Sequence, residues 1–474
     1  MTDAPLAIVL AAGLSTRMRS KTPKVLHSIA GRPLIAHVLE TVRAVGARPL
    51  VVLSRENEAA RALLDGARVA VQDPARGTGD AVRVALEQAE GENGVAYIVY
   101  GDTPLVRPET LTRLRALLAE RAASLAILSA DVGTDNAYGR VVRDGQGDVA
   151  RIVEARVASP AERALPESIL GAYAVDLPWL RSAISRLREN ETGEIFLTDL
   201  VAEATREGRR VAVHRTADPE EGLGVNTRVE LAAAEGALRR RIRESHMLAG
   251  VTFRDPESCQ VDAGVSIAAD VVIERGTILE GKTVIGVASR IGPYTVLRDT
   301  TVGERCRVEQ STLEGATLED DVTVGPYAHL RPGAYLERGV SMGNYGEVKN
   351  ARLRAGTKMH HFGYVGDADI GARVNIGAGT ITVNYDGVRK HRTVVGDDAF
   401  IGSDTLLRAP VTIGAGATTG AGAVVTRDVP EGMVAVGMPA RAIKRADRRA
   451  KDKAAQPDPS AASGAAGSAP KPPV

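Results

Sequence analysis

The chain of 474 residues is longer than one hydrophobic core usually organises, so two or more domains are expected. Its 60 basic and 59 acidic residues leave a net charge of +1, which gives no whole-chain reason to expect a nucleic acid or a membrane as partner. Two cysteines exclude a disulfide framework, and no apolar run reaches the roughly 18 residues that cross a membrane, so we expect a soluble, cytoplasmic protein.

The first part of the chain alternates apolar and helical stretches. Apolar segments at 6–13, 48–54, 95–102 and 125–130 predict strands, and 107–120 has the pattern of a helix. This alternation predicts an α/β domain around a mainly parallel sheet, over residues 1–225. A proline-free stretch rich in Ala, Leu, Arg and Glu follows at 226–250 and predicts a linker helix that ends at Gly250.

Two features at strand ends of the first domain suggest a phosphate site. The small-residue loop AAGLSTRM follows the first strand, and its backbone N–H groups could approach phosphates while Arg17 and Lys24 supply charge. Asp102 ends another strand, where open α/β sheets bind ligands, and its carboxylate could hold Mg²⁺. Taken singly, a tight turn and a capping aspartate explain them as well. Their combination favours nucleotide binding.

Beyond the linker helix, aliphatic residues recur at every sixth position, which is typical of a hexapeptide β-helix. At about 18 residues per coil and ~4.8 Å of rise, the repeat predicts roughly nine coils over about 43 Å. The domain is expected over 251–445, and the tail at 446–474, which has few large apolar residues, is predicted to be disordered. The repeated positions are Val261, Ile267, Ile273, Leu279, Ile285, Ile291 and Leu297, then Val395, Ile401, Leu407, Ile413, Thr419 and Val425.

Two interruptions of the repeat attract attention. A polar, basic excursion runs from Ile381 to Thr393, and loops that leave a solenoid often carry binding residues. The adjacent His360 and His361 follow Met359 at or beside a corner, so alternation alone does not choose between them. An imidazole with a pKa of about 6.5 can take a proton from an ammonium group before its nitrogen attacks a thioester. Because some β-helices only assemble subunits, the fold alone does not decide.

The order of several short motifs closely resembles a known enzyme family. The motifs LAAGLSTRM, QDPARGTGDA, YGDTPL, GEIFLTD and GVNTR are followed by LRPGAYL, KMHHFGYVGDADIG, NIGAGT, NYDG and IGSDT. In this order they are similar to the bifunctional N-acetylglucosamine-1-phosphate uridylyltransferases/glucosamine-1-phosphate acetyltransferases of bacteria, over about Pro5 to Lys444. The resemblance implies a Rossmann-like nucleotidyltransferase domain, the linker helix and a left-handed parallel β-helix that assembles as a homotrimer.

The resemblance also implies two reactions. The acetyl group of acetyl-CoA passes to glucosamine 1-phosphate, and the product then takes a uridylyl group from UTP with Mg²⁺, which releases pyrophosphate. The product, UDP-N-acetylglucosamine, serves peptidoglycan synthesis. One alternative keeps only the nucleotidyl transfer, with the β-helix as a trimerising or regulatory module. A second alternative is a structural or binding protein in which the loop and Asp102 are relics.

For the nucleotidyl site, the resemblance assigns residues to the phosphates, the base, the metal and the sugar. One position departs from the family, because Ile169 stands where an asparagine usually contacts the sugar, and this loses a polar contact. The implied residues are Leu10, Ala11, Ala12, Gly13 and Lys24 for the phosphates, Gln72, Gly77 and Thr78 for uracil, Tyr100 and Gly101 beside Asp102, Asp102 and Asn226 for Mg²⁺, and Gly139 and Glu154 for the sugar.

For the acetyl site, the resemblance makes His361 the base and His360, at a position that is often a small residue, a bystander. Met438 stands where the family has a coenzyme-binding arginine, so the contacts with acetyl-CoA are expected to differ there. The implied residues are Arg331, Lys349, Tyr364 and Asn375 for the sugar phosphate, Asn384, Tyr385 and Lys390 closing over it, and Ala378, Ser403, Ala421 and Met438 for acetyl-CoA.

Overall fold

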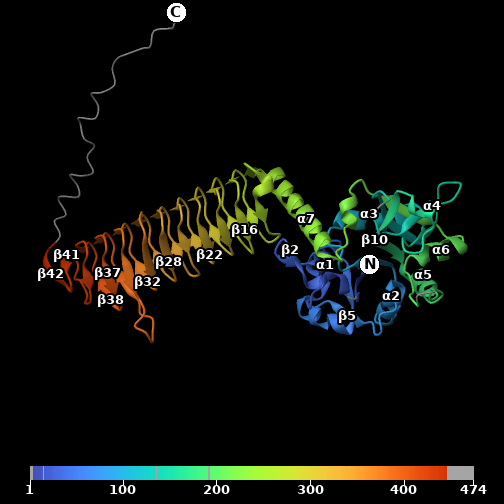
Figure 1. Cartoon of the computed structure of the whole chain (residues 1–474), viewed down its shortest axis with the longest axis horizontal. Coiled ribbons are helices and arrows are strands. Elements are labelled where there is room, and N and C mark those ends of the chain that lie inside the picture. The colour runs from blue at the N-terminus through green and yellow to red at the C-terminus, as the bar shows by residue number, and fades with distance from the viewer. Residues whose placement is uncertain (1–3, 14, 135, 191–192, 446–474) are drawn as a thin grey trace, which may run out of the picture. The chain divides into compact units, whose positions relative to one another are not determined.

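The computed structural model describes residues 4–13, 15–134, 136–190 and 193–445 (Figure 1). The tail at 446–474, which was predicted to be disordered, lies outside the described residues. The chain forms two compact units that divide between Glu244 and Ser245. The predicted domain boundaries at 225 and 250 lie on either side of this division and stay predictions.

The first unit is built on one mainly parallel sheet, as predicted. Strand order is β11-β7-β10-β6-β1-β4-β5, and only β10 runs antiparallel to its neighbours β6 and β7 in this path. A hairpin of β8 and β9, which the sequence did not predict, attaches to β10. The strands are β1 (Leu6–Ala11), β4 (Arg48–Leu53), β5 (Arg68–Val71), β6 (Val95–Tyr100), β7 (Leu125–Asp131), β8 (Arg140–Arg143), β9 (Val149–Val153), β10 (Glu167–Asp176) and β11 (Val211–Arg215).

Helices cover both faces of this sheet because successive side chains along its strands point alternately into two apolar cores. In β1, Ile8 packs into one core, together with helices α2, α5 and α6, whereas Val9 packs into the other, with α1 and α3. This leaves the strand ends free to carry polar residues. The helices are α1 (Leu34–Ala44), α2 (Thr78–Glu87), α3 (Pro108–Glu120), α5 (Leu177–Ile184) and α6 (Asp199–Arg206).

The predicted linker helix is α7 (Arg228–Leu248). Its residues as far as Glu244 belong to the first unit, and Ala234 and Ala237 are buried there in a small core with Leu105. Arg241 donates hydrogen bonds to the Leu105 carbonyl oxygen at 2.7 Å and to Asp218 at 3.0 Å. Burial lowers the pKa of this guanidinium, while Asp218 opposes that shift. Within the part of the chain that the structure describes, no helix is long and apolar enough to cross a membrane.

The second unit is a left-handed β-helix in which each coil passes through three parallel sheets in turn. Sheet 1 runs from β12 (Thr252–Phe253) to β42 (Ala440–Arg445), sheet 2 from β13 (Gln260–Val261) to β40 (Val424–Val425), and sheet 3 from β14 (Ser266–Ile267) to β38 (Val411–Ile413). Every predicted repeat residue is buried inside the coil. The 10 strands of sheet 2 are separated by nine spacings of ~4.8 Å, which matches the predicted length.

The predicted excursion is shorter than expected. Ile381–Val383 forms β34 in sheet 2 and Thr393–Val395 forms β35 in sheet 3, so only 384–392 leaves the coil, as the loop that projects in Figure 1. The prediction was too wide because the polar Thr382 and Thr393 face inward, where the repeat otherwise has aliphatic residues. Thr382 Oγ1 donates to the Gly366 carbonyl oxygen at 3.0 Å. Polar interior residues break a pattern that is read from aliphatic side chains alone.

The corner between sheets 1 and 2 has a regular three-residue pattern, and we call it the first corner. Its first position is glycine in most coils near the middle and end of the helix, and His360 is an exception. The second position holds His361. These corners are residues 325–327, 343–345, 360–362, 377–379, 402–404 and 420–422. The strands that precede them on sheet 1 are, in the same order, β24 (Thr323–Val324), β27 (Ser341–Met342), β30 (Lys358–Met359), β33 (Asn375–Ile376), β36 (Phe400–Ile401) and β39 (Thr418–Thr419). The strands that follow them on sheet 2 are β25 (His329–Leu330), β28 (Gly346–Lys349), β31 (Gly363–Gly366), β34, β37 (Leu406–Arg408) and β40.

Candidate active sites

The carboxyl ends of β1 and β6 open into a cavity of about 500 Å³ in the first unit. Neighbouring parallel strands end at the same edge of a sheet, so the loop after β1 and the carboxylate after β6 meet there. Among the predicted residues, the cavity is lined by Leu10, Ala11, Ala12, Gly13, Lys24, Gln72, Gly77, Thr78, Tyr100, Asp102 and Glu154.

The turn before α2 shapes one wall of this nucleotide cavity. Gly77 has φ +100° and a Cβ there would lie 2.5 Å from the Ile195 carbonyl oxygen, so only glycine fits. Gln72 is buried and donates to the Gly77 carbonyl oxygen at 3.0 Å, which fixes the turn. Thr78 accepts a hydrogen bond from the Leu197 N–H at 3.0 Å. The N-terminus of α2 therefore faces the cavity on a rigid turn.

Four polar side chains converge at the opposite wall. The Lys24 ammonium forms an ion pair with Asp102 and donates to the Asn226 side-chain oxygen at 2.9 Å. Arg17 donates to the same Asn226 oxygen at 3.0 Å. Asp102 and Asn226 thus direct two hard oxygen donors at one cation, which is the donor set that Mg²⁺ accepts alongside phosphate oxygens. Among the described residues, no group of three or more His, Cys, Asp or Glu side chains could hold a metal.

Glu154 occupies the far end of the nucleotide cavity. Burial raises the pKa of its carboxyl group, and the hydrogen bond from Thr198 Oγ1 at 2.8 Å opposes that shift. Beside it, Arg156 pairs with Glu194 and stacks 4.5 Å from the centre of the Phe196 ring. Sequence reasoning did not predict Arg156, Glu194 and Phe196 as cavity residues. Glu194 and Phe196 lie in the motif GEIFLTD, which resembles the family and could have indicated them.

Four predicted residues do not line the nucleotide cavity. Asn226 is linked to the cavity by the hydrogen bond that its side-chain oxygen accepts from the cavity residue Lys24. Gly101 joins the ends of β1 and β6, because its N–H donates to the Leu10 carbonyl oxygen at 2.8 Å. Gly139 and Ile169 are buried and adjacent, since a Cβ on Gly139 would lie 3.3 Å from Ile169 Cγ2. The isoleucine side chain therefore packs into the sheet core instead of presenting a polar group to a ligand.

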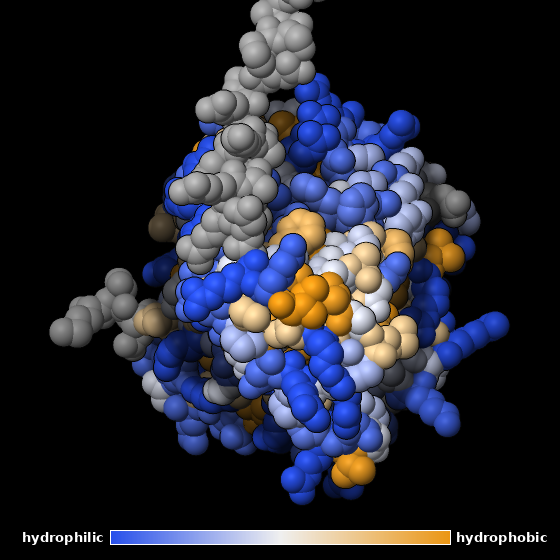
Figure 2. Space-filling model, turned by 90° about the vertical axis from the view of Figure 1, so that its left-hand side faces the viewer, coloured by the Kyte–Doolittle hydropathy of each residue, from blue (hydrophilic) through white to orange (hydrophobic). Residues whose placement is uncertain are grey.

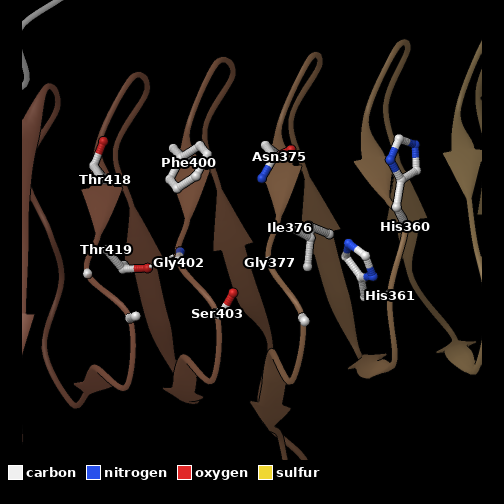
Figure 3. Close-up of a pocket in the computed structure, with 13 residues that line it drawn as sticks. His360, His361, Asn375, Ile376, Gly377, Phe400, Gly402, Ser403, Thr418 and Thr419 are labelled. Atoms are coloured by element: carbon white, nitrogen blue, oxygen red, sulfur yellow. Dashed lines mark hydrogen bonds between the residues drawn. The ribbon is translucent and has the colours of Figure 1, made fainter.

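A groove of about 520 Å³ runs along sheet 1 and the first corner of the second unit (Figure 3). Its floor is bare backbone at Gly377, Gly402 and Gly420, because a Cβ on Gly377 or Gly402 would meet the next coil at 2.6 or 2.5 Å. The predicted residues that line the groove are His361, Asn375, Ala378, Ser403 and Ala421.

The two histidines occupy different columns of the first corner. His361 shares the second corner position with Ala378, Ser403 and Ala421, the residues expected to line the coenzyme groove. His360 stands in the glycine column, and its Nε2 lies 3.0 Å from Ser341 Oγ. Figure 3 shows His361 on the side of Ser403 and His360 level with the row of Asn375, Phe400 and Thr418. The fold thus distinguishes two residues that the sequence pattern left equivalent.

Most predicted sugar-phosphate residues gather at the other edge of sheet 2, which we call the second corner. Contact with the Lys390 ammonium lowers the pKa of Lys349, and Arg331 adds to that repulsion. Asn384 donates toward the Tyr364 hydroxyl at 3.4 Å. Such a cluster of cations suits a phosphate dianion. Asn375 does not join this cluster, because it lies on sheet 1 in the groove.

The remaining two predictions fall outside both cavities. Tyr385 shapes the loop at 384–392, since its hydroxyl donates to the Gly387 carbonyl oxygen at 2.6 Å and its backbone pairs with Lys390. Met438 is 77% exposed in the turn between β41 (Met433–Gly437) and β42, beyond the residues that line the groove.

Comparisons with known proteins agree with this division into two units. Residues 7–167 match the MobA-like NTP transferase domain, and residues 392–427 match the bacterial transferase hexapeptide (six repeats). The bifunctional protein GlmU of Alkalilimnicola ehrlichii is 44% identical over 93% of this chain and 96% of its own. The GlmU proteins of Bordetella parapertussis and Streptococcus equi subsp. zooepidemicus are 45% and 42% identical, over 90% and 92% of this chain and 95% and 96% of their own. At this identity over nearly the whole length, the chain belongs to the family of bifunctional GlmU proteins.

Proposed function

We propose that the nucleotide cavity is the uridylyl transfer site and that the groove at the first corner is the acetyl transfer site. The chain is a bifunctional enzyme of UDP-N-acetylglucosamine synthesis, with a uridylyltransferase and a glucosamine-1-phosphate acetyltransferase activity. The observation that carries the assignment of sites is that a cavity of the first unit and a groove of the second are lined by several of the residues expected for uridylyl and for acetyl transfer, respectively.

In the uridylyl site, the protein supplies charge and alignment rather than a nucleophile. The loop at 10–13 and Lys24 hold the UTP phosphates, and Gln72 and Thr78 read the base beside the rigid turn at Gly77. Asp102 and Asn226 would hold Mg²⁺, which supplies positive charge against the phosphates when it is bound. Lys24 lies between these oxygens and the loop, so its ammonium can leave Asp102 for the triphosphate. The sugar phosphate then attacks the α-phosphorus in line, and pyrophosphate leaves.

In the acetyl site, His361 acts as general base. Its imidazole takes the proton from the amino group of glucosamine 1-phosphate, and the freed nitrogen attacks the thioester carbonyl carbon. The carbon–sulfur bond breaks, and the sulfur leaves with a proton as free coenzyme A. Arg331, Lys349 and Lys390 hold the phosphate dianion of the acceptor. No cysteine nucleophile is needed, since Cys306 is buried and burial raises the pKa of its thiol to about 11.

We infer that three copies of the chain complete this site. Within one chain, His361 and Asn375 lie at the first corner and on sheet 1, whereas Lys349 lies across sheet 2 at the second corner. A copy that presents its second corner to the first corner of its neighbour brings the two halves together, and three copies close such a ring.

A column of exposed aromatic rings on the first corner supports the same assembly. The column consists of Tyr294, Tyr327, Tyr345 and Phe362, which are each at least half exposed. The rings of Tyr327 and Tyr345 stack with centroids 5.3 Å apart. In a chain with only 3% aromatic residues, this concentration of exposed rings indicates a contact surface. We propose a cytoplasmic homotrimer, in a compartment that keeps Cys259 and Cys306 reduced.

Product analysis tests the proposed function. The purified enzyme is incubated with glucosamine 1-phosphate, acetyl-CoA, UTP and Mg²⁺, and with each of these left out in turn. UDP-N-acetylglucosamine and pyrophosphate are expected only in the complete mixture, whereas free thiol needs only glucosamine 1-phosphate and acetyl-CoA. A chelator should therefore stop pyrophosphate release without stopping thiol release. Pyrophosphate release from UTP and N-acetylglucosamine 1-phosphate, with no thiol release from acetyl-CoA, would instead favour a nucleotidyltransferase with a structural β-helix.

A panel of hexosamine 1-phosphates tests the effect of Ile169. Because the isoleucine is buried and offers no polar group, the uridylyl site is expected to discriminate less between hexosamines than a site with an asparagine there. An Ile169→Asn variant provides the matched comparison.

A further inference from the structure

Segment 194–198 contacts both ends of the nucleotide cavity. Its residues alternate in what they contact, because the odd ones bond to the turn before α2 and the even ones to the residues that follow β9. Glu194 and Phe196 line the cavity together with Thr78 of that turn and with Glu154. The segment therefore links the end proposed for the base to the end proposed for the sugar.

On the side of the base, the contacts are made by the backbone of two buried residues. The Ile195 N–H donates to the Arg76 carbonyl oxygen at 2.9 Å, and the Ile195 carbonyl oxygen accepts from the Gly79 N–H at 2.9 Å. The Leu197 N–H donates to Thr78 Oγ1 at 3.0 Å. Both side chains are buried in one apolar core of the sheet. Because three hydrogen bonds and this burial join them, a shift of the segment also shifts the turn.

On the side of the sugar, the contacts are made by side chains. Arg156 lies two residues after Glu154, forms an ion pair with Glu194 and stacks 4.5 Å from the centre of the Phe196 ring. Thr198 Oγ1 donates to Glu154 at 2.8 Å. The Arg156 and Glu194 side chains are 48% and 39% exposed, so water screens their attraction and the pair contributes little by itself.

We propose that segment 194–198 couples the two substrates of uridylyl transfer, so that each binds more tightly when the other is present, with Arg156 as a positioning residue. This rests on the proposed uridylyl site. A sugar phosphate that fills its end of the cavity displaces water from the Arg156–Glu194 pair, and the attraction rises as the local dielectric constant falls. The strengthened pair holds the segment, and the segment holds the turn at Thr78. Because linkage is reciprocal, UTP favours binding of the sugar phosphate by the same factor.

Binding measurements on the full-length enzyme with Mg²⁺ test the coupling. The probe is α,β-methylene-UTP, whose methylene bridge prevents uridylyl transfer. Its Kd is measured by calorimetry without sugar phosphate and with saturating N-acetylglucosamine 1-phosphate, for the wild type, Arg156→Gln and Glu194→Gln. The ratio of the two Kd values is the coupling factor, and each variant removes the ion pair from a different side.

Two exposed arginines outside the segment serve as matched controls. Arg151 in β9 is 47% exposed and pairs with Glu162, so Arg151→Gln removes an ion pair that does not involve segment 194–198. Arg445 belongs to β42, at the end of the coil onto which Figure 2 looks, where hydrophilic side chains surround hydrophobic ones. Arg445→Gln removes a positive charge from the second unit. Both control variants should keep the wild-type coupling factor.

In the wild type, the sugar phosphate should lower the Kd of α,β-methylene-UTP at least about fivefold, and the factor should fall below about twofold in Arg156→Gln and in Glu194→Gln. A purely structural role would weaken nucleotide binding equally in both conditions, so an unchanged factor in either variant overturns the proposal. A wild-type factor of one overturns it as well. A wild type that does not bind α,β-methylene-UTP would instead refute the proposed uridylyl site, and the coupling with it.

Discussion

The two adjacent histidines give a stringent test of the acetyl site, because they are one residue apart and occupy different columns of the coil. A general base contributes roughly 10²- to 10⁴-fold to a proton transfer, or about 3–5 kcal/mol of barrier, so His361→Ala should lower kcat for acetyl transfer by that factor. His360 contacts Ser341 Oγ at 3.0 Å, and one exposed hydrogen bond is worth about 1 kcal/mol. His360→Ala should therefore cost less than about tenfold.

Both variants are assayed for thiol release from acetyl-CoA and for pyrophosphate release from UTP. Uridylyl transfer should stay at the wild-type rate in each, which controls for folding of the first unit, and circular dichroism controls for the β-helix. Equal losses of acetyl transfer in the two variants would refute the reasoning, because the column argument assigns proton transfer to His361 alone. An unchanged rate in His361→Ala would remove the base from the proposed mechanism altogether.

Three further predictions concern the nucleotide cavity and the subunit contact. Gly77→Ala should raise the KM for UTP roughly five- to 150-fold and spare acetyl transfer, since φ +100° and the contact with Ile195 cost about 1–3 kcal/mol. A normal KM would show that the turn relaxes. Burial raises the pKa of Glu154, so its carboxyl group becomes protonated at a higher pH than an ordinary glutamate does. The KM for N-acetylglucosamine 1-phosphate should therefore rise as the pH falls through that shifted pKa. Glu154→Gln should remove this rise at the acid side of the pH profile. Tyr345→Asp should dissociate the trimer in equilibrium sedimentation and lower acetyl but not uridylyl transfer, whereas a wild type that sediments as a monomer at micromolar concentration would contradict the assembly.

The sequence predicted well those features of the first domain that follow from a single physical rule. The small-residue loop after β1 and Asp102 after β6 were expected together because parallel strands end at one edge, and both line the cavity. Arg156 was missed because its role depends on the stacking with Phe196 and the ion pair with Glu194, which no sequence spacing encodes. Ile169 was expected near the sugar, but its burial became visible only once β10 was placed antiparallel between two strands.

The second domain was predictable in its interior and less so on its surface. Buried aliphatic residues must recur with the coil, so the six-residue period gave the interior positions and the approximate length. The surface has no such constraint, and the wide estimate of the excursion arose from the inward-facing Thr382 and Thr393. That Asn375 lies on sheet 1 and Lys349 at the far end of a sheet 2 strand also depends on where each strand joins its corner, which a count of residues does not show.

A change of residue type along the first corner explains why the acetyl-transfer groove begins at His361. In the coils before it, the third corner position carries the rings of Tyr327 and Tyr345, and Phe362 ends the series. In the coils after it, the same position is Gly379, Asp404 and Gly422, none of which carries a ring. In the proposed trimer, large rings fill space between subunits and small residues leave it empty, so one corner would provide both a contact and a channel. The proposed base stands at the boundary, where a neighbouring subunit can reach it and the donor can still enter.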